Sequence, residues 1–253
     1  MITTENELWH KVEINEDCPS PRNGHTCVVL NGTIYIFGGS SPDTGPLDDM
    51  WTLEFTDETL RKAKWSRITY EGEHKPSERE LHSMFLVDSH SGISETKEKP
   101  NPGSYRETRI AVYGGKTEQH NSLSDLHLFD LQTKTWKELK VSSGEQTSGS
   151  RVASSCSERT DAVGRVPIFG GWDGESTVFA DALILQFGPN YTVSAKQVSL
   201  GGATGTARIA GAACMRTTSE EGYHMDTHYI FGGCGPEADT NNVARTQFFR
   251  DFT

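Results

Sequence analysis

The sequence Ile34-Tyr35-Ile36-Phe37-Gly38-Gly39, a β-rich run closed by a glycine pair, decides the fold because it recurs three more times. The later copies end at Gly114-Gly115, Gly170-Gly171 and Gly232-Gly233, at intervals of 56 to 76 residues. Recurrence on this scale is typical of folds in which each unit buries its faces only against its neighbours. A glycine pair also permits positive φ angles and close backbone approaches that a side chain would block. The pattern predicts a repetitive β fold with a site built from loops.

Each glycine pair lies inside a longer repeated pattern. An arginine opens an apolar run upstream of it, and in three units an aspartate opens another run downstream. A further run, led by Trp65 in the first unit and Trp136 in the second, follows. This order predicts four antiparallel strands per unit, joined by polar and glycine-rich turns. The units are residues 20–70, 77–140, 149–198 and 206–253, and their arginines are Arg22, Arg79, Arg151 and Arg208.

These repeats resemble those of the kelch-repeat family, whose repeats form the blades of a β-propeller. The resemblance covers almost the whole chain and rests on four glycine pairs, each preceded by an arginine. It implies an all-β fold, a β-propeller of four-stranded antiparallel blades, with residues 1–253 forming a single domain. An ordinary β-sandwich is the alternative, but a sandwich would not need the fourfold recurrence.

The two ends of the chain look like parts of one blade. Residues 7–14 resemble a fourth strand without the first three, and residues 241–253 resemble a third strand without a fourth. Propellers remove their exposed sheet edges by closing the ring, so we expect the N-terminal strand to complete the last blade. Four units are few for a kelch ring. Either the ring closes with four blades, or the chain is incomplete, or two chains complete a larger ring; the complementary ends favour the first arrangement.

The charge and cysteine content limit the partners and the compartment. A net charge of −11 argues against nucleic acid or an anionic membrane surface as a partner. The longest apolar stretch, residues 179–187, is too short to be inserted across a bilayer, and the first fifteen residues do not resemble a secretory signal. Five cysteines without a Cys-x-x-Cys motif favour a reducing compartment, the cytoplasm or nucleus. We expect Cys27, Cys156 and Cys214 to be small buried residues near the propeller axis.

One face of the propeller is the expected site. Because consecutive strands are antiparallel, loops that enter the first strand and loops that leave a glycine pair gather on the same face. In the kelch family this face commonly captures a protein or peptide, so the resemblance implies such a partner here. The expected binding residues are Arg22, Asn23, Arg79, Glu80, His120, Asn121, Arg151, Trp172, Asp173 and Arg208.

The arginines and Trp172 have two interpretations each. The arginines suit a carboxylate-bearing partner through forked hydrogen bonds. Alternatively they are structural and pair with carbonyls or acidic neighbours, which we favour because every repeat has one. Trp172 differs from its counterparts in the other repeats, so it is either an exposed binding anchor or a contact to the adjacent blade.

An enzymatic function is the alternative to protein binding. Some kelch-like propellers are copper oxidases, sugar mutarotases or the specifier proteins of glucosinolate breakdown, and their chemistry requires converging ligands or acid–base groups. His25 and His82 share one repeat position, which favours a structural role, and the Glu-x-x-x-Asp-x-x-x-His spacing of the specifier iron site does not occur. We expect no catalytic residue, metal site or cofactor. The predicted function is a non-catalytic interaction scaffold or adaptor; the alternative is a small-molecule enzyme or carbohydrate-binding propeller that uses the central pocket.

Overall fold

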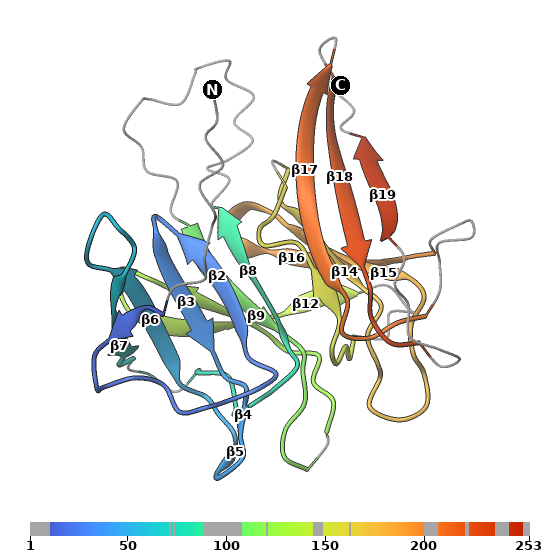
Figure 1. The fold of residues 1–253 in the computed structure, drawn as a ribbon. Coiled ribbons are helices and arrows are strands. Elements are labelled where there is room, and N and C mark those ends of the chain that lie inside the picture. Colours follow the sequence, from blue (N-terminus) through green and yellow to red (C-terminus); the bar gives the residue numbers. More distant parts are fainter. Residues whose placement is uncertain are drawn as a thin grey trace.

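The computed structural model describes the chain in ten segments and is built from β-sheets (Figure 1). The described residues are 11–70, 72, 74–88, 108–119, 121–143, 149–161, 163–199, 207–220, 223–235 and 243–249. Over these residues, no helix is long and apolar enough to span a membrane. The one helical element among the described residues is a short 3-10 turn, Pro189–Tyr191. The predicted all-β class is confirmed.

The first two repeats form antiparallel sheets in which neighbouring strands follow one another along the chain. In the first sheet, the two-residue turn between the first pair of strands has positive φ at both Asn31 and Gly32, the geometry that matches the twist of a hairpin. The strands of this sheet are β2 (Thr26–Leu30), β3 (Thr33–Phe37), β6 (Met50–Phe55) and β7 (Lys62–Ile68). The second sheet contains β8 (Ser83–Asp88), β9 (Thr108–Tyr113), β10 (Leu126–Asp130) and β11 (Thr135–Leu139).

The last two repeats follow the same order. The third sheet contains β13 (Ser155–Cys156), β14 (Arg165–Phe169), β15 (Ala182–Phe187) and β16 (Val193–Val198). The fourth consists of β17 (Ala212–Glu220), β18 (Tyr223–Phe231) and β19 (Val243–Phe249). Every pairing between these strands is antiparallel, as the sequence predicted.

The N-terminal strand does not join the fourth sheet over its described part. β1 (Glu13–Ile14) pairs in parallel with β7 of the first sheet. Asn15 fixes this position, because its side chain exchanges two hydrogen bonds with the backbone of Trp65, at 2.7 and 3.0 Å. β12 (Val141–Ser143) is added in the same way to β16. The prediction that residues 7–14 complete the last blade is therefore wrong for residues 13 and 14, and residues 7–10 lie outside the described residues.

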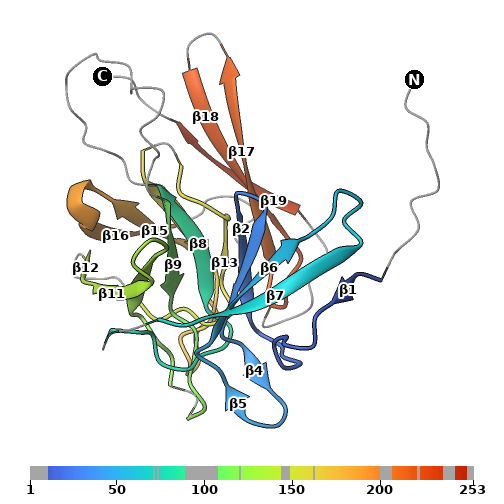
Figure 2. The same cartoon turned by 90° about the vertical axis from the view of Figure 1, so that its left-hand side faces the viewer.

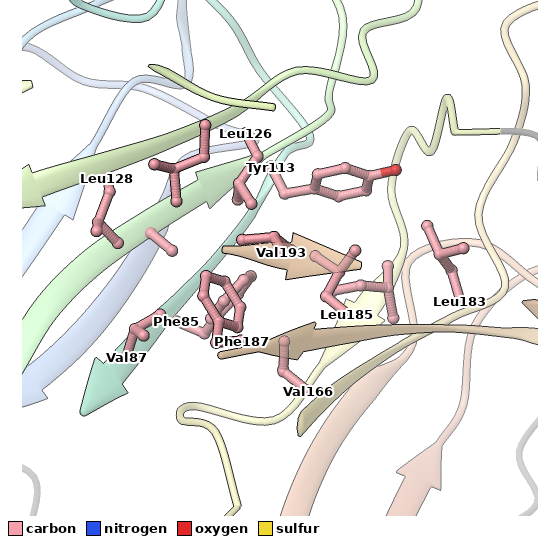
Figure 3. Packing of buried hydrophobic residues seen from close by; sticks show 13 residues of the cluster. Phe85, Val87, Tyr113, Leu126, Leu128, Val166, Leu183, Leu185, Phe187 and Val193 are labelled. Carbon is pink, nitrogen blue, oxygen red and sulfur yellow. The ribbon is translucent and has the colours of Figure 1, made fainter. Parts of the chain in front are cut away.

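Hydrophobic layers join consecutive sheets. The layer between the second and third sheets contains Phe85 and Phe187, whose rings are 6.0 Å apart (Figure 3). A second layer joins the first and second sheets around Phe37 and Phe129, and a smaller one joins the third and fourth around Phe169. Alternate residues of the strands in the second and third sheets thus pack against opposite neighbours, as expected for sheets that are covered on both faces.

A backbone ladder also links the four units, just before β2, β8, β13 and β17 begin. The second residue after each arginine has a positive φ and bonds to its counterpart in the next unit. Leu81 donates to Gly24, Ala153 donates to Leu81, and Ala210 donates to Ala153, at 2.7 to 2.8 Å. Within the described residues this ladder has three links, and no hydrogen bond joins Ala210 back to Gly24.

Two cysteines depart from the expectation. Cys156 packs against the core, and burial raises the pKa of its thiol to about 11. Cys27 and Cys214 are exposed instead of buried. The reason is position: Cys27 lies on the outer face of the first sheet and Cys214 on the outer face of the fourth, and none of the described sheets covers these two faces.

Candidate interaction face

A buried arginine precedes the first strand of each repeat and donates to the glycine pair of the same repeat. In the second unit, Arg79 donates from Nη1 to the carbonyl oxygen of Gly114 at 3.0 Å. Its two terminal nitrogens also form a forked pair with Asp125, at 2.8 Å on each arm. Burial raises the pKa of Asp125, but hydrogen bonds from Arg79 and His127 outweigh burial and hold that pKa well below its ordinary value. The side chain of Arg79 is fully buried, so this pair is internal to the unit.

The other units repeat this arrangement. The side chains of Arg22 and Arg151 are also buried and pair with Asp49 and Asp181, at 2.5 and 2.7 Å. Each arginine also donates to the carbonyl oxygen of the first glycine in the glycine pair of the same unit. The donors and acceptors are Arg22 to Gly38, Arg151 to Gly170 and Arg208 to Gly232. The contacts therefore agree with the structural interpretation of the arginines.

The glycine pairs are needed because the next repeat lies against them. Gly39 donates its N–H to the carbonyl oxygen of Arg79 at 2.9 Å. A Cβ on the preceding Gly38 would stand 2.7 Å from the same oxygen. The second and third pairs make the same contacts to the next arginine, namely Gly114-Gly115 to Arg151 and Gly170-Gly171 to Arg208.

The residue after each arginine pairs with the residue after each glycine pair. The four backbone bridges are Asn23 with Ser40, Glu80 with Lys116, Val152 with Trp172 and Ile209 with Cys234. Loops entering the first strand and loops leaving the glycine pairs therefore lie together, which confirms the predicted sharing of a face.

In three units the loop after the glycine pair is a small hairpin. The hairpins are residues 40–46, 116–122 and 172–178, and β4 (Ser40–Ser41) with β5 (Gly45–Pro46) forms the first of them. β4 and β5 lie at the lower end of the molecule in Figures 1 and 2. Neighbouring hairpins approach each other: a Cβ on Gly174 would be 2.7 Å from Ser122, and one on Gly45 would be 3.8 Å from Glu118. We call these three hairpins, with Asn23 and Glu80, the hairpin face.

The predicted binding residues differ in their exposure and in their contacts on the hairpin face. Asn23 and Asn121 are exposed, and Trp172 is half-buried at the base of its hairpin. Glu80 is tied to Lys116 by an ion pair of 3.3 Å. His120 lies outside the described residues.

Asp173 shapes its own hairpin. Its carboxylate accepts the backbone N–H groups of Thr177, at 3.0 Å, and Glu175, at 2.8 Å. These bonds lower the pKa of Asp173 from its ordinary value. The residue therefore contributes to the shape of the face as well as to its charge.

Acidic side chains dominate the accessible charge of the hairpin face. The prediction of a carboxylate-bearing partner rested on the arginines, whose guanidinium groups are buried, although the predicted binding residues also included the acidic Glu80 and Asp173. The acidic residues of the face are Asp43, Glu80, Glu118, Asp173 and Glu175, whereas Lys116 is the basic residue paired with Glu80. The acidic residues can be read from the loop sequences, and the repeated pattern of arginines and glycine pairs does not account for them.

His82, one of two buried histidines in the described part of the second unit, is structural. His82 lies 2.6 Å from the hydroxyl of Thr26 in the preceding sheet, and its ring packs edge-on against Phe37. Burial, with a smaller effect of the Arg79 charge, lowers the pKa of His82 to about 3. Among the residues that the structure describes, no three His, Cys, Asp or Glu side chains are arranged to hold a metal ion.

Comparisons with known proteins agree with this repeated architecture. A family model described as the KLHDC2/KLHL20/DRC7 Kelch-repeats domain matches residues 1–94. Human Kelch domain-containing protein 1 is 29% identical over 55% of this chain and 29% of its own length. These matches support assignment of the chain to the kelch-repeat family.

Other relatives match at similar identity. Leucine-zipper-like transcriptional regulator 1 of Pongo abelii is 26% identical over 96% of this chain and 31% of its own length. Tip elongation aberrant protein 3 of Schizosaccharomyces pombe is 30% identical over 49% of this chain and 10% of its own. The chain thus spans about a third or less of the curated relatives it matches. Kelch-repeat domains are generally protein-interaction domains, and the family is generally non-enzymatic.

Proposed function

We propose that this kelch chain is a non-catalytic interaction module that binds a protein or peptide partner through the hairpin face. The observation that carries the proposal is the contiguity of three different hairpins on one repeated frame. The buried arginines and the glycine pairs hold the frame, so the hairpins are presented on rigid strands. Binding surfaces on loops held by a rigid scaffold are common.

Variation between equivalent positions supports the same surface. The first residue after the glycine pair is Ser40, Lys116, Trp172 or Cys234 in the four units. The arginine–glycine frame repeats because each unit needs it, but nothing in the frame requires these different side chains. Trp172 offers a large ring of the kind that dominates binding energy when it is covered.

The charge of the hairpin face favours a partner with a basic segment. Asp43, Glu118 and Glu175 are exposed on adjacent hairpins. Complementary charge steers association and raises its rate more than it raises affinity. We therefore propose a basic peptide or protein surface as the partner, in place of the acidic one that the arginines suggested.

We also propose that the four sheets are blades of one propeller domain, with the units given above. The three joints support this arrangement, because each repeats the same glycine-to-arginine contact and the same ladder link. The five free thiols suit a reducing compartment, and we propose the cytoplasm as the location.

Affinity capture with matched variants tests the proposed function. The tagged chain is compared with Trp172→Ala, with the double variant Glu118→Lys/Glu175→Lys, and with Leu60→Ala, an exposed change in the turn between β6 and β7. We expect a partner retained by the wild type and by Leu60→Ala, and lost at least tenfold by both hairpin variants. A partner that all four chains retain equally would refute the hairpin face.

A further inference from the structure

The aromatic residue before each glycine pair identifies an uncovered joint. Phe37, Tyr113 and Phe169 are exposed by 0%, 1% and 2%, whereas their counterpart Phe231 is exposed by 56%. The first three are covered by the next sheet. Phe37, for example, packs on His82 and Trp136 of the second unit, with ring centroids 5.4 and 5.3 Å apart.

The first sheet has the complementary uncovered surface. Cys27 and Val29 stand five and seven residues after Arg22, as Met84 and Leu86 do after Arg79. Met84 and Leu86 are buried in the layer against the first sheet. Cys27 is exposed, and Val29 is exposed by 49%.

The backbone ladder ends at the same two places. Ala210 carries the last carbonyl of the ladder and Gly24 the first N–H group. Neither has a hydrogen-bond partner within the part of the chain that the structure describes. The described part of one chain therefore ends in two unmatched halves of a joint that it makes three times internally.

We propose that a second copy of this chain completes the joint, with the Phe231 surface of one copy packed on the Val29 surface of the other. Two such contacts, related by a twofold axis, close a ring of two chains and eight sheets. Closed twofold pairs are the commonest oligomers, and propellers reach about eight blades. Within the described residues the Phe231 surface and the Val29 surface of one chain do not cover each other, which favours the second copy over a ring of four. The inference rests on the proposed blade architecture and not on the partner of the hairpin face.

Two native cysteines report on the proposed contact. Cys27 and Cys214 occupy the positions that Met84 and Val28 hold in the layer between the first and second sheets. The equivalent contact between two chains brings Cys27 of one copy beside Cys214 of the other. Both thiols are exposed in the single chain, so a short bismaleimide, which adds to two thiols without an oxidant, can join them.

The first test is the mass of the full chain in solution. We expect a dimer by sedimentation at micromolar concentration, and conversion to monomer by either Val29→Asp or Phe231→Asp. Leu60→Asp, which places the same charge at an exposed turn that accepts positive φ, leaves the dimer intact. Circular dichroism of each variant establishes that the sheets are retained. A wild-type monomer, or an open polymer, would overturn the proposal.

The second test separates a dimer from a ring closed by one chain. Cys18→Ser/Cys234→Ser chains, labelled and unlabelled with nitrogen-15, are mixed and treated with the bismaleimide. Mass spectrometry should find Cys27–Cys214 peptides that join a labelled to an unlabelled chain. Cys27–Cys214 links formed only within one chain would overturn the second copy, and so would the absence of this link.

Discussion

The carbonyl oxygen of Arg151 lies so close to Gly114 that a Cβ on the glycine would stand only 2.6 Å from it. The two residues belong to consecutive repeats, and Gly115 donates to the same oxygen at 3.0 Å. The contact recurs between the first and second and between the third and fourth units. It explains why the repeats carry glycine pairs.

Gly114→Ala should therefore separate the second and third sheets. Its φ of +67° already disfavours alanine, by about 1–2 kcal/mol, and the clash with backbone adds to that cost. The control is Gly32→Ala, at φ +80° with nothing within 4 Å, where only the backbone cost applies. We expect Gly114→Ala to lower the free energy of unfolding in urea by at least about 2 kcal/mol more than Gly32→Ala. Equal losses would contradict the joint.

Arg79→Met should lower the stability of the fold, rather than weaken only the binding of a partner. Removing the guanidinium takes the Arg79 donors from the Asp125 carboxylate and the Gly114 carbonyl and leaves Asp125 with its His127 bond. Breaking a buried pair costs about 3–5 kcal/mol. Because Asp125 is partly exposed, we expect the low end of that range in urea unfolding. Lys75→Ala removes an exposed pair with Asp48 and should cost less than about 1 kcal/mol. A stable Arg79→Met chain that has lost only its partner would instead favour recognition by the arginines.

His82 should make stability depend on pH below its ordinary pKa of 6.5. In the folded chain the pKa is about 3, so between these values the unfolded chain takes up a proton that the folded chain rejects. Stability then falls as pH drops, by up to about 1.4 kcal/mol per pH unit for this group. His82→Gln removes the titration while keeping a group that can bond to Thr26. Its free energy of unfolding should fall less steeply between pH 6 and 5 than that of the wild type, and parallel curves would contradict this account.

The fold was largely predictable because its determinants are local and repeated. Each glycine pair needs space beside it, and each buried arginine needs an acid and a carbonyl, so both leave a mark in every unit. Because an arginine occurs in every repeat, the sequence by itself favours a structural role for Arg22, Arg79 and Arg151. Repetition thus identified the strands, their antiparallel order and the shared face of the loops.

The N-terminal strand was not predictable in this way. A strand of two residues, Glu13 and Ile14, carries too little pattern to choose between two sheet edges. Its position depends on Asn15, whose side chain bonds to Trp65 fifty residues away. The exposure of Cys27 and Cys214 escaped prediction for a related reason, because a repeat position specifies a face of the sheet but not whether another sheet covers it.

Amide hydrogen exchange on the chain with its captured partner is the measurement that tests the hairpin face most directly. We predict that the partner slows exchange in residues 40–46, 116–119 and 172–178, and that this protection weakens as salt screens the acidic side chains. Protection confined to the turns at the opposite ends of the strands, such as residues 57–61, with the hairpins unchanged, would contradict it.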